Sequence, residues 1–143
     1  SLSQQLNAIY LFKDLTEFHV KDSDPTALID LTIERLNFIR NNATFEDKEE
    51  IFLSTLIDLE NKYKAYPVST EISFQIAYLY NNQANQYNFK QNTTNQFKRS
   101  DALKICENAI NRFPESKGAN KCRSLKEQIK KENLRISVEN FIS

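Results

Sequence analysis

The chain has 143 residues, of which 40% are hydrophobic and 27% charged, and its 19 Lys and Arg balance its 19 Asp and Glu. This length is that of one domain, and the neutral charge argues against a disordered acidic tail and a basic nucleic-acid-binding protein. One Gly and three Pro leave few residues for tight hairpin turns, so we expect an all-α fold.

Apolar spacing predicts three helices in the first half of the chain, over about residues 3–18, 24–40 and 44–66. The second begins at Asp24-Pro25, because Asp caps helices well and the fixed φ of Pro suits the first helical position. The third carries a stripe at steps of four and three, made of Phe52, Leu56, Leu59, Tyr63 and Tyr66. It ends before Pro67, because a proline pushes the preceding residue out of the α region.

Three more helices are predicted in the second half, over about residues 69–82, 100–113 and 116–131. The stretch 81–96 is rich in Asn and Gln, and we expect a loop or a frayed helix there. After the last helix, Leu134, Ile136 and Val138 alternate with polar residues, which is the period of a half-buried strand. We therefore expect a helical domain over residues 1–132, and a following β domain or a tail over 133–143.

Part of a tetratricopeptide repeat, a helix-turn-helix unit with a period of 34 residues, is visible in the second half. Small residues and a closing proline stand at the offsets of its second helix: Ala102, Cys106, Ala109 and Pro114. Ala77 and Tyr80 suit its first helix, whereas Lys62 stands where the preceding unit would place a small residue. We expect about six helices in antiparallel hairpins with tetratricopeptide-like packing, and a generic helical bundle is the alternative.

The segments DALKICENAI (101–110), RFPES (112–116) and GANKC (118–122) resemble the N-terminal helical region of alpha-2-macroglobulin-like proteins from the Bacteroidetes group. The ending LRISVE (134–139) is similar to the first strand of the macroglobulin domain that follows in that family. The resemblance implies an exported parent, periplasmic or associated with the outer membrane and anchored to it, that traps or inhibits proteases. A chain that begins at Ser1 and holds no Met fits a fragment of such a parent.

The resemblance implies a non-catalytic scaffold that docks to other domains of the parent or to an envelope protein. The thioester motif of the family is Cys-Gly-Glu-Gln, and neither Cys106 nor Cys122 begins such a run. A stand-alone adaptor that binds a peptide between its helices is the alternative function. No apolar run approaches the roughly 20 residues of a membrane-spanning helix, so we expect the piece itself to be soluble.

Cys106 and Cys122 stand eight residues before and eight residues after Pro114, each on the apolar stripe of its helix. An antiparallel hairpin would bring the two together, either as a disulfide or as two buried free thiols. Two thiols without a third and a fourth ligand do not make a closed zinc site, so we expect no metal.

Nothing in the sequence indicates catalysis or a cofactor. His19 is the only histidine, at a helix end, where a surface or capping role is expected. The acidic pairs Glu46-Asp47 and Glu49-Glu50 fall in a first helical turn, where acids favour the helix dipole. A chain whose only glycine is Gly118 has no glycine-rich phosphate loop.

Aromatic residues surround the Asn/Gln-rich stretch and are candidates for partner contact. Tyr87 and Phe89 lie inside it, and we name them as candidate contacts for a protein partner. Tyr78 and Tyr80 precede it, and we expect them to pack against a neighbouring helix.

Overall fold

The computed structural model describes residue 10, residues 24–86 and residues 97–142. These residues form five helices and no strand, which confirms the all-α class: α2 (Thr26–Asn42), α3 (Lys48–Lys62), α4 (Ser69–Asn85), α5 (Lys98–Arg112) and α6 (Lys117–Ile142). The helix expected over residues 3–18 lies outside the described residues, apart from Tyr10.

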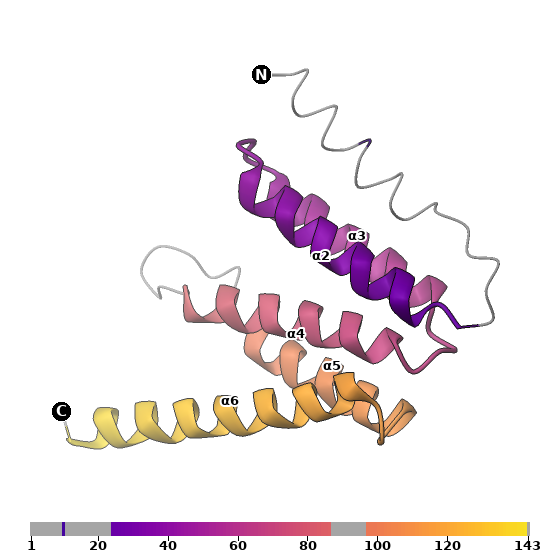
Figure 1. Cartoon of the computed structure of the whole chain (residues 1–143). Helices are drawn as coiled ribbons and strands as arrows, with labels where there is room; N and C mark the ends of the chain where they lie inside the picture. The colour runs from indigo at the N-terminus through magenta and orange to yellow at the C-terminus, as the bar shows by residue number, and fades with distance from the viewer. Residues whose placement is uncertain (1–9, 11–23, 87–96, 143) are drawn as a thin grey trace.

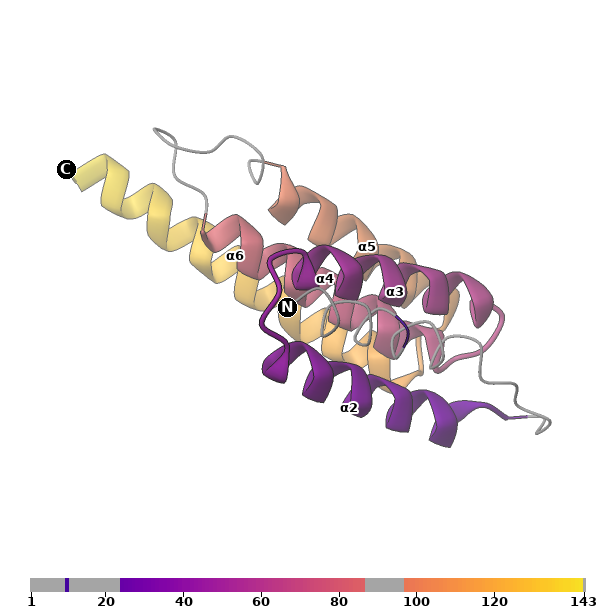
Figure 2. The same ribbon diagram turned by 90° about the horizontal axis from the view of Figure 1, so that it is seen from above.

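Consecutive helices run in alternating directions (Figure 1). In Figure 1, α2, α4 and α6 lie in front, and α3 and α5 lie behind them. The view from above shows α2 and α5 on opposite sides of the molecule (Figure 2). α4 is the central helix, because it packs against α3, α5 and α6.

Most helix boundaries follow the local signals expected from the sequence. Asp24 accepts hydrogen bonds from the backbone N–H and the hydroxyl of Thr26 at the start of α2. These bonds lower the pKa of Asp24. α3 ends earlier than its apolar stripe, so Tyr66 lies in the following turn, where its ring centroid is 6.2 Å from that of Tyr63.

Two hydrophobic clusters share α4. The first lies between α2, α3 and α4 and includes Ile29, Ile33, Leu36, Phe52, Leu56, Leu59, Ile72, Ile76 and Leu79. The second lies between α4, α5 and α6 and is built of smaller residues: Ala77, Ala102, Cys106, Ala109, Cys122, Leu125 and Ile129. The small side chains of the second cluster leave room for α5 to lie close to α4.

The start of α6 lies directly on the backbone of α4. A Cβ atom placed on Gly118 would lie 2.1 Å from the carbonyl carbon of Thr70 and 2.3 Å from the backbone nitrogen of Glu71. The hydroxyl of Ser116 lies 2.8 Å from that of Thr70 and accepts a hydrogen bond from the backbone N–H of Ala119. Ser116 therefore caps α6 and links it to α4, at a contact that only glycine permits.

The prediction of a strand at the end of the chain is wrong, because residues 134–142 continue α6. Two of the residues that alternate in the period of a strand, Leu134 and Val138, also fit a helix, since they are four apart. A strand needs a partner for its backbone groups, and a helix satisfies them within itself. The end of α6 projects past the other helices (Figures 1 and 2), and the domain boundary expected at residue 133 falls inside it.

Candidate functional site

A pair of aromatic rings lies partly exposed on α4. Glu71, Phe74 and Tyr78 follow one another at steps of three and four, so their side chains share one face of the helix. The ring centroids of Phe74 and Tyr78 are 5.9 Å apart, and the ring planes are tilted by 34°. Because Tyr78 is 45% exposed, the pair leaves aromatic surface open to solvent.

Lys121 of α6 lies beside this aromatic pair. Its Nζ is 3.3 Å from Oε2 of Glu71 and 5.9 Å from the ring centroid of Phe74. The Lys121 side chain is 47% exposed, whereas that of Glu71 is 13% exposed. Lys121 thus links α6 to α4 and keeps a positive charge at the edge of the aromatic surface.

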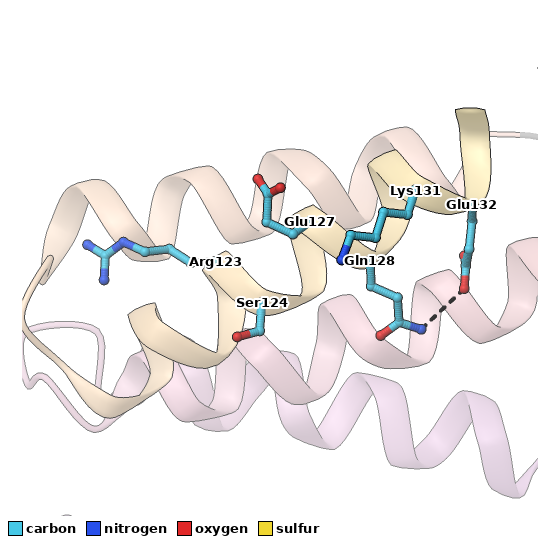
Figure 3. Close-up of a pocket in the computed structure, with 6 residues that line it drawn as sticks. All are labelled: Arg123, Ser124, Glu127, Gln128, Lys131 and Glu132. Atoms are coloured by element: carbon cyan, nitrogen blue, oxygen red, sulfur yellow. Dashed lines mark hydrogen bonds between the residues drawn. The ribbon is translucent and has the colours of Figure 1, made fainter. Parts of the chain in front are cut away.

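A hollow of about 540 Å³ follows α6 (Figure 3). All the side chains that line it come from this helix: Arg123, Ser124, Glu127, Gln128, Lys131 and Glu132. Ser124 and Gln128 follow Lys121 by three and seven residues, which places them on the same side of α6. Gln128 donates a hydrogen bond of 3.2 Å from Nε2 to Oε1 of Glu132.

Asp30 of α2 lies close enough to α4 and α6 for their charges to act on it. Partial burial raises the pKa of Asp30, and the carboxylate of Glu71 raises it further, while Lys117 and Lys121 lower it. We group side chains of these three helices under one name, the front face. It consists of Asp30, Phe74, Tyr78, Lys121, Ser124 and Gln128.

A second polar group lies between α3, α4 and the end of α5. Ser73 donates a hydrogen bond of 2.6 Å to Oε1 of Glu60. Arg112 approaches the same oxygen at 3.5 Å and the hydroxyls of Ser69 and Ser73 at 3.2 Å. Glu60 and Arg112 also line a hollow of about 340 Å³ together with Lys64, Ile105 and Asn108. This ion pair is largely buried and connects three helices.

The hairpin of α5 and α6 brings the two cysteines together, as expected from their spacing. Cys106 and Cys122 are fully buried and are free thiols in the structure. A hydrogen bond between the two thiols, together with burial, raises the pKa of Cys106 far above its ordinary value. The same hydrogen bond lowers the pKa of Cys122, and the guanidinium of Arg112 lowers it further.

The candidate aromatic residues have different outcomes. Tyr87 and Phe89, the candidate partner contacts, lie outside the described residues, so this prediction stays open. Tyr80 packs against both hydrophobic clusters, with Nζ of Lys98 4.3 Å from its ring centroid. Tyr78 lies beside Phe74 of its own helix, with the two ring planes tilted by 34°, and is exposed.

Phe74 and Lys121 were not among the functional residues expected from the sequence. The spacing of Glu71, Phe74 and Tyr78 beside the apolar stripe of the helix was a usable signal for the aromatic pair. No such local signal exists for Lys121, because its contacts lie 50 and 47 residues away in the chain.

Other candidate residues have structural roles or lie outside the described part. His19 is not among the described residues. Glu49 lies in the first turn of α3, as expected, and also accepts three hydrogen bonds of 2.7–3.0 Å from Arg40 of α2. Among the residues that the structure describes, no three His, Cys, Asp or Glu side chains gather in a way that would hold a metal ion.

Within this described part, none of the helices has the length and apolar composition of a membrane-spanning segment. Comparisons of the chain with known protein families, with curated proteins and with solved structures gave no match.

Proposed function

We propose that the chain is a non-catalytic, tetratricopeptide-like module that binds an extended segment of a partner protein on its front face. The observation that carries this proposal is the pair of Phe74, which is partly buried, and Tyr78, which is 45% exposed, with the positive charge of Lys121 at its edge. Exposed aromatic surface next to charged and polar side chains is typical of protein-interaction sites.

The packing of the helices supports the tetratricopeptide-like part of the proposal. Consecutive helices alternate in direction, and Ala77, Ala102 and Ala109 are fully buried in the cluster between α4, α5 and α6. Pro114 follows α5 at the position where the repeat ends its second helix. In such an arrangement α4 is the first helix of a unit and α5 the second. The residues of the front face then lie on the first helices of successive units, α2, α4 and α6.

The chemistry of the front face favours a peptide over a nucleic acid or a small metabolite. An apolar side chain of the peptide would cover Tyr78, and an acidic group would pair with Lys121. Ser124 and Gln128 carry hydroxyl and amide groups that match the backbone N–H and C=O groups of an extended chain. Asp30 provides the opposite charge at the side of α2.

The resemblance of residues 101–122 and 134–139 supports the further proposal that this module belongs to the N-terminal region of an exported alpha-2-macroglobulin-like envelope protein that inhibits proteases. In that setting the bound segment belongs to another domain of the parent or to an envelope protein. A stand-alone adaptor is the second candidate, and it would use the same front face. Both candidates leave the chain without a catalytic role.

Selection of binding peptides tests the function. A phage-displayed library of random peptides is panned against the purified chain, and enriched peptides are measured by titration. We expect enriched peptides whose affinity falls at least about tenfold in the variants Tyr78→Ala and Lys121→Ala. Tyr66→Ala is the matched control, because it removes another exposed tyrosine, 39% exposed, from the turn after α3. Failure to enrich peptides, or equal binding by all variants, would overturn the proposal.

Fractionation of the source cells distinguishes the two settings. Antibodies against the chain are used to follow its mass and its location in the native organism. A product much larger than 16.7 kDa in the envelope fraction supports the alpha-2-macroglobulin-like parent. A product near 16.7 kDa in the cytoplasm contradicts that parent and favours the adaptor.

A further inference from the structure

The hollow between α3 and α5 has no part in the proposed binding function. It has a volume of about 340 Å³ and is lined by Glu60 of α3, Lys64 of the turn after α3, and Ile105, Asn108 and Arg112 of α5. Ile105, Asn108 and Arg112 follow one another at steps of three and four, so they share one face of α5. In Figure 1 both helices lie behind α2, α4 and α6, which carry the front face. The hollow is therefore a separate candidate site, and its volume suits a small molecule.

Arg112 is only loosely paired in this hollow. Its side chain is 21% exposed, and its ion pair with Glu60 is long, at 3.5 Å. The same nitrogen, Nη2, makes the contacts of 3.2 Å with the hydroxyls of Ser69 and Ser73. Nε of Arg112 is buried and has no hydrogen-bond partner in the described part of the chain. Because a buried charge without close partners is costly, an anion in the hollow would supply the compensation that Glu60 gives only in part.

Lys64 and Asn108 leave polar groups free at the same hollow. Both residues are exposed, and neither side chain makes a hydrogen bond or an ion pair with the residues that the structure describes. The ammonium group of Lys64 and the amide of Asn108 are hydrogen-bond donors. The lining carries two positive charges, on Lys64 and Arg112, and one negative charge, on Glu60. Oε1 of Glu60 already accepts a hydrogen bond of 2.6 Å from Ser73, so the free groups of the hollow favour an anion.

Ile105 adds an apolar wall to this set of donors. It is partly buried and packs against both hydrophobic clusters. We propose that the hollow binds a small organic carboxylate. The carboxylate pairs with Lys64, accepts a hydrogen bond from Asn108 and lies in the field of the Arg112 guanidinium. The short apolar part of the ligand covers Ile105. An inorganic anion would leave Ile105 without a contact, and this is why we assign an organic acid.

Binding in this hollow would connect the two hydrophobic clusters. α3 contributes Phe52 and Leu56 to the first cluster, and α5 contributes Ala102 to the second. A ligand that contacts both Lys64, after α3, and Asn108, on α5, therefore joins the two groups of helices. Since a ligand that binds only the folded chain stabilises it, we expect the melting temperature to rise with the concentration of the carboxylate.

A titration with isocaproate, a carboxylate with a branched apolar tail, tests the proposal. Isocaproamide, the neutral amide of the same shape, is the control ligand, and the ionic strength is held constant because salt screens exposed charges. We expect isocaproate to shift the NMR signals of the Ile105 methyl groups and of the Asn108 side-chain amide to saturation, with a Kd below about 10 mM. Isocaproamide should bind at least about tenfold more weakly. Shifts that do not saturate, or equal binding of the two compounds, would overturn the proposal.

Substitutions at the hollow locate the site. Lys64→Gln removes a positive charge and should weaken the binding of isocaproate at least about threefold. Asn108→Asp replaces a donor by a negative charge of the same shape and should weaken it at least about tenfold. Lys131→Gln removes a positive charge from α6 and is the matched control, which should bind as the native chain does.

Both substituted side chains lack partners in the described part of the chain, so we expect the variants to keep the fold, which circular dichroism checks. Should Asn108→Asp fail to fold, Lys64→Gln and its control carry the test. Unchanged affinity in Lys64→Gln would contradict the assigned site. Displacement of isocaproate by an equal concentration of inorganic phosphate would contradict the assigned class of ligand.

Discussion

Gly118 shows how one residue sets the distance between two helices. A Cβ atom at this position would overlap backbone atoms of Thr70 and Glu71. Helix backbone atoms cannot move aside in the way that the end of a flexible side chain can. The two helices α4 and α6 would have to move apart, and the hydrogen bond between Ser116 and Thr70 would lengthen.

We expect Gly118→Ala to lower the free energy of unfolding by about 2–3 kcal/mol, a typical cost of overpacking. Urea unfolding followed by circular dichroism measures this difference. Ser124→Ala is the control, because it lies on the exposed side of α6 and should change stability by less than about 0.5 kcal/mol. An unchanged midpoint for Gly118→Ala would show that α6 does not lie directly on the backbone of α4.

Asp30 illustrates the cost of placing a carboxylate on the front face. Its pKa in the folded chain is raised above the ordinary value of 3.8, so ionisation is harder in the folded chain than in the unfolded chain. Ionised Asp30 therefore lowers stability at pH values above its raised pKa. Well below 3.8 the group is neutral in both states and contributes nothing.

We expect Asp30→Asn to stabilise the chain at neutral pH by less than about 1 kcal/mol, since the site is partly exposed. Urea unfolding at neutral pH and again near pH 2.5, below the ordinary pKa, measures the effect. The gain should vanish at the lower pH. A gain that persists in acid would come from a source other than the charge of Asp30.

At the scale of elements, α6 divides into a packed part and a projecting part. Ile129 is fully buried, whereas beyond it Leu134, Val138 and Phe141 are 68%, 49% and 92% exposed. The last nine residues of the helix, Leu134–Ile142, therefore add little to the core of the chain.

We expect deletion of residues 134–143 to change the melting temperature by less than about 3 °C. Thermal unfolding followed by circular dichroism tests this, and the helical signal of the folded chain should fall in proportion to the removed length. The control deletion removes residues 129–143, including buried Ile129, and should destabilise the chain clearly. A large loss of stability on the shorter deletion would mean that the projecting part packs against the protein.

The elements also show what the sequence could predict. Asp24 and Pro114 mark helix ends through local rules, so the positions of α2 to α6 follow from the sequence within a few residues, except for the end of α6. α3 ends at Lys62, before the end that was expected from Pro67. There, Leu134, Ile136 and Val138 have the two-residue period of a strand, while Leu134 and Val138 also have the four-residue spacing of a helix. So short a run cannot distinguish the two structures.

Contacts between distant segments explain most of what the sequence could not predict. The meeting of Cys106 and Cys122 was predictable because both lie on one hairpin, at equal distances from Pro114. The front face depends on the register of α6 against α4, which is set by Gly118, and on the approach of α2. Neither the register of α6 nor the approach of α2 produces a periodic pattern in the amino-acid sequence.

At the scale of the whole molecule, the two hydrophobic clusters make α4 the link between two halves. Leu36 of α2 is buried in the cluster with α3 and α4, and Ile129 of α6 is buried in the cluster with α4 and α5. Proteins built from stacked helical hairpins gain stability mainly from contacts between neighbours, so their ends open separately.

We expect this organisation to appear in native-state hydrogen exchange followed by mass spectrometry. Leu36→Ala and Ile129→Ala each remove a fully buried side chain and should cost about 2–5 kcal/mol. Leu36→Ala should speed exchange in α2 and α3 and leave α6 protected, whereas Ile129→Ala should speed exchange in α5 and α6 and leave α2 unchanged. α4 should respond to both substitutions, because it borders both clusters. If either substitution speeds exchange equally in all five helices, the described part of the chain unfolds as a single cooperative unit, and the repeat-like organisation is wrong.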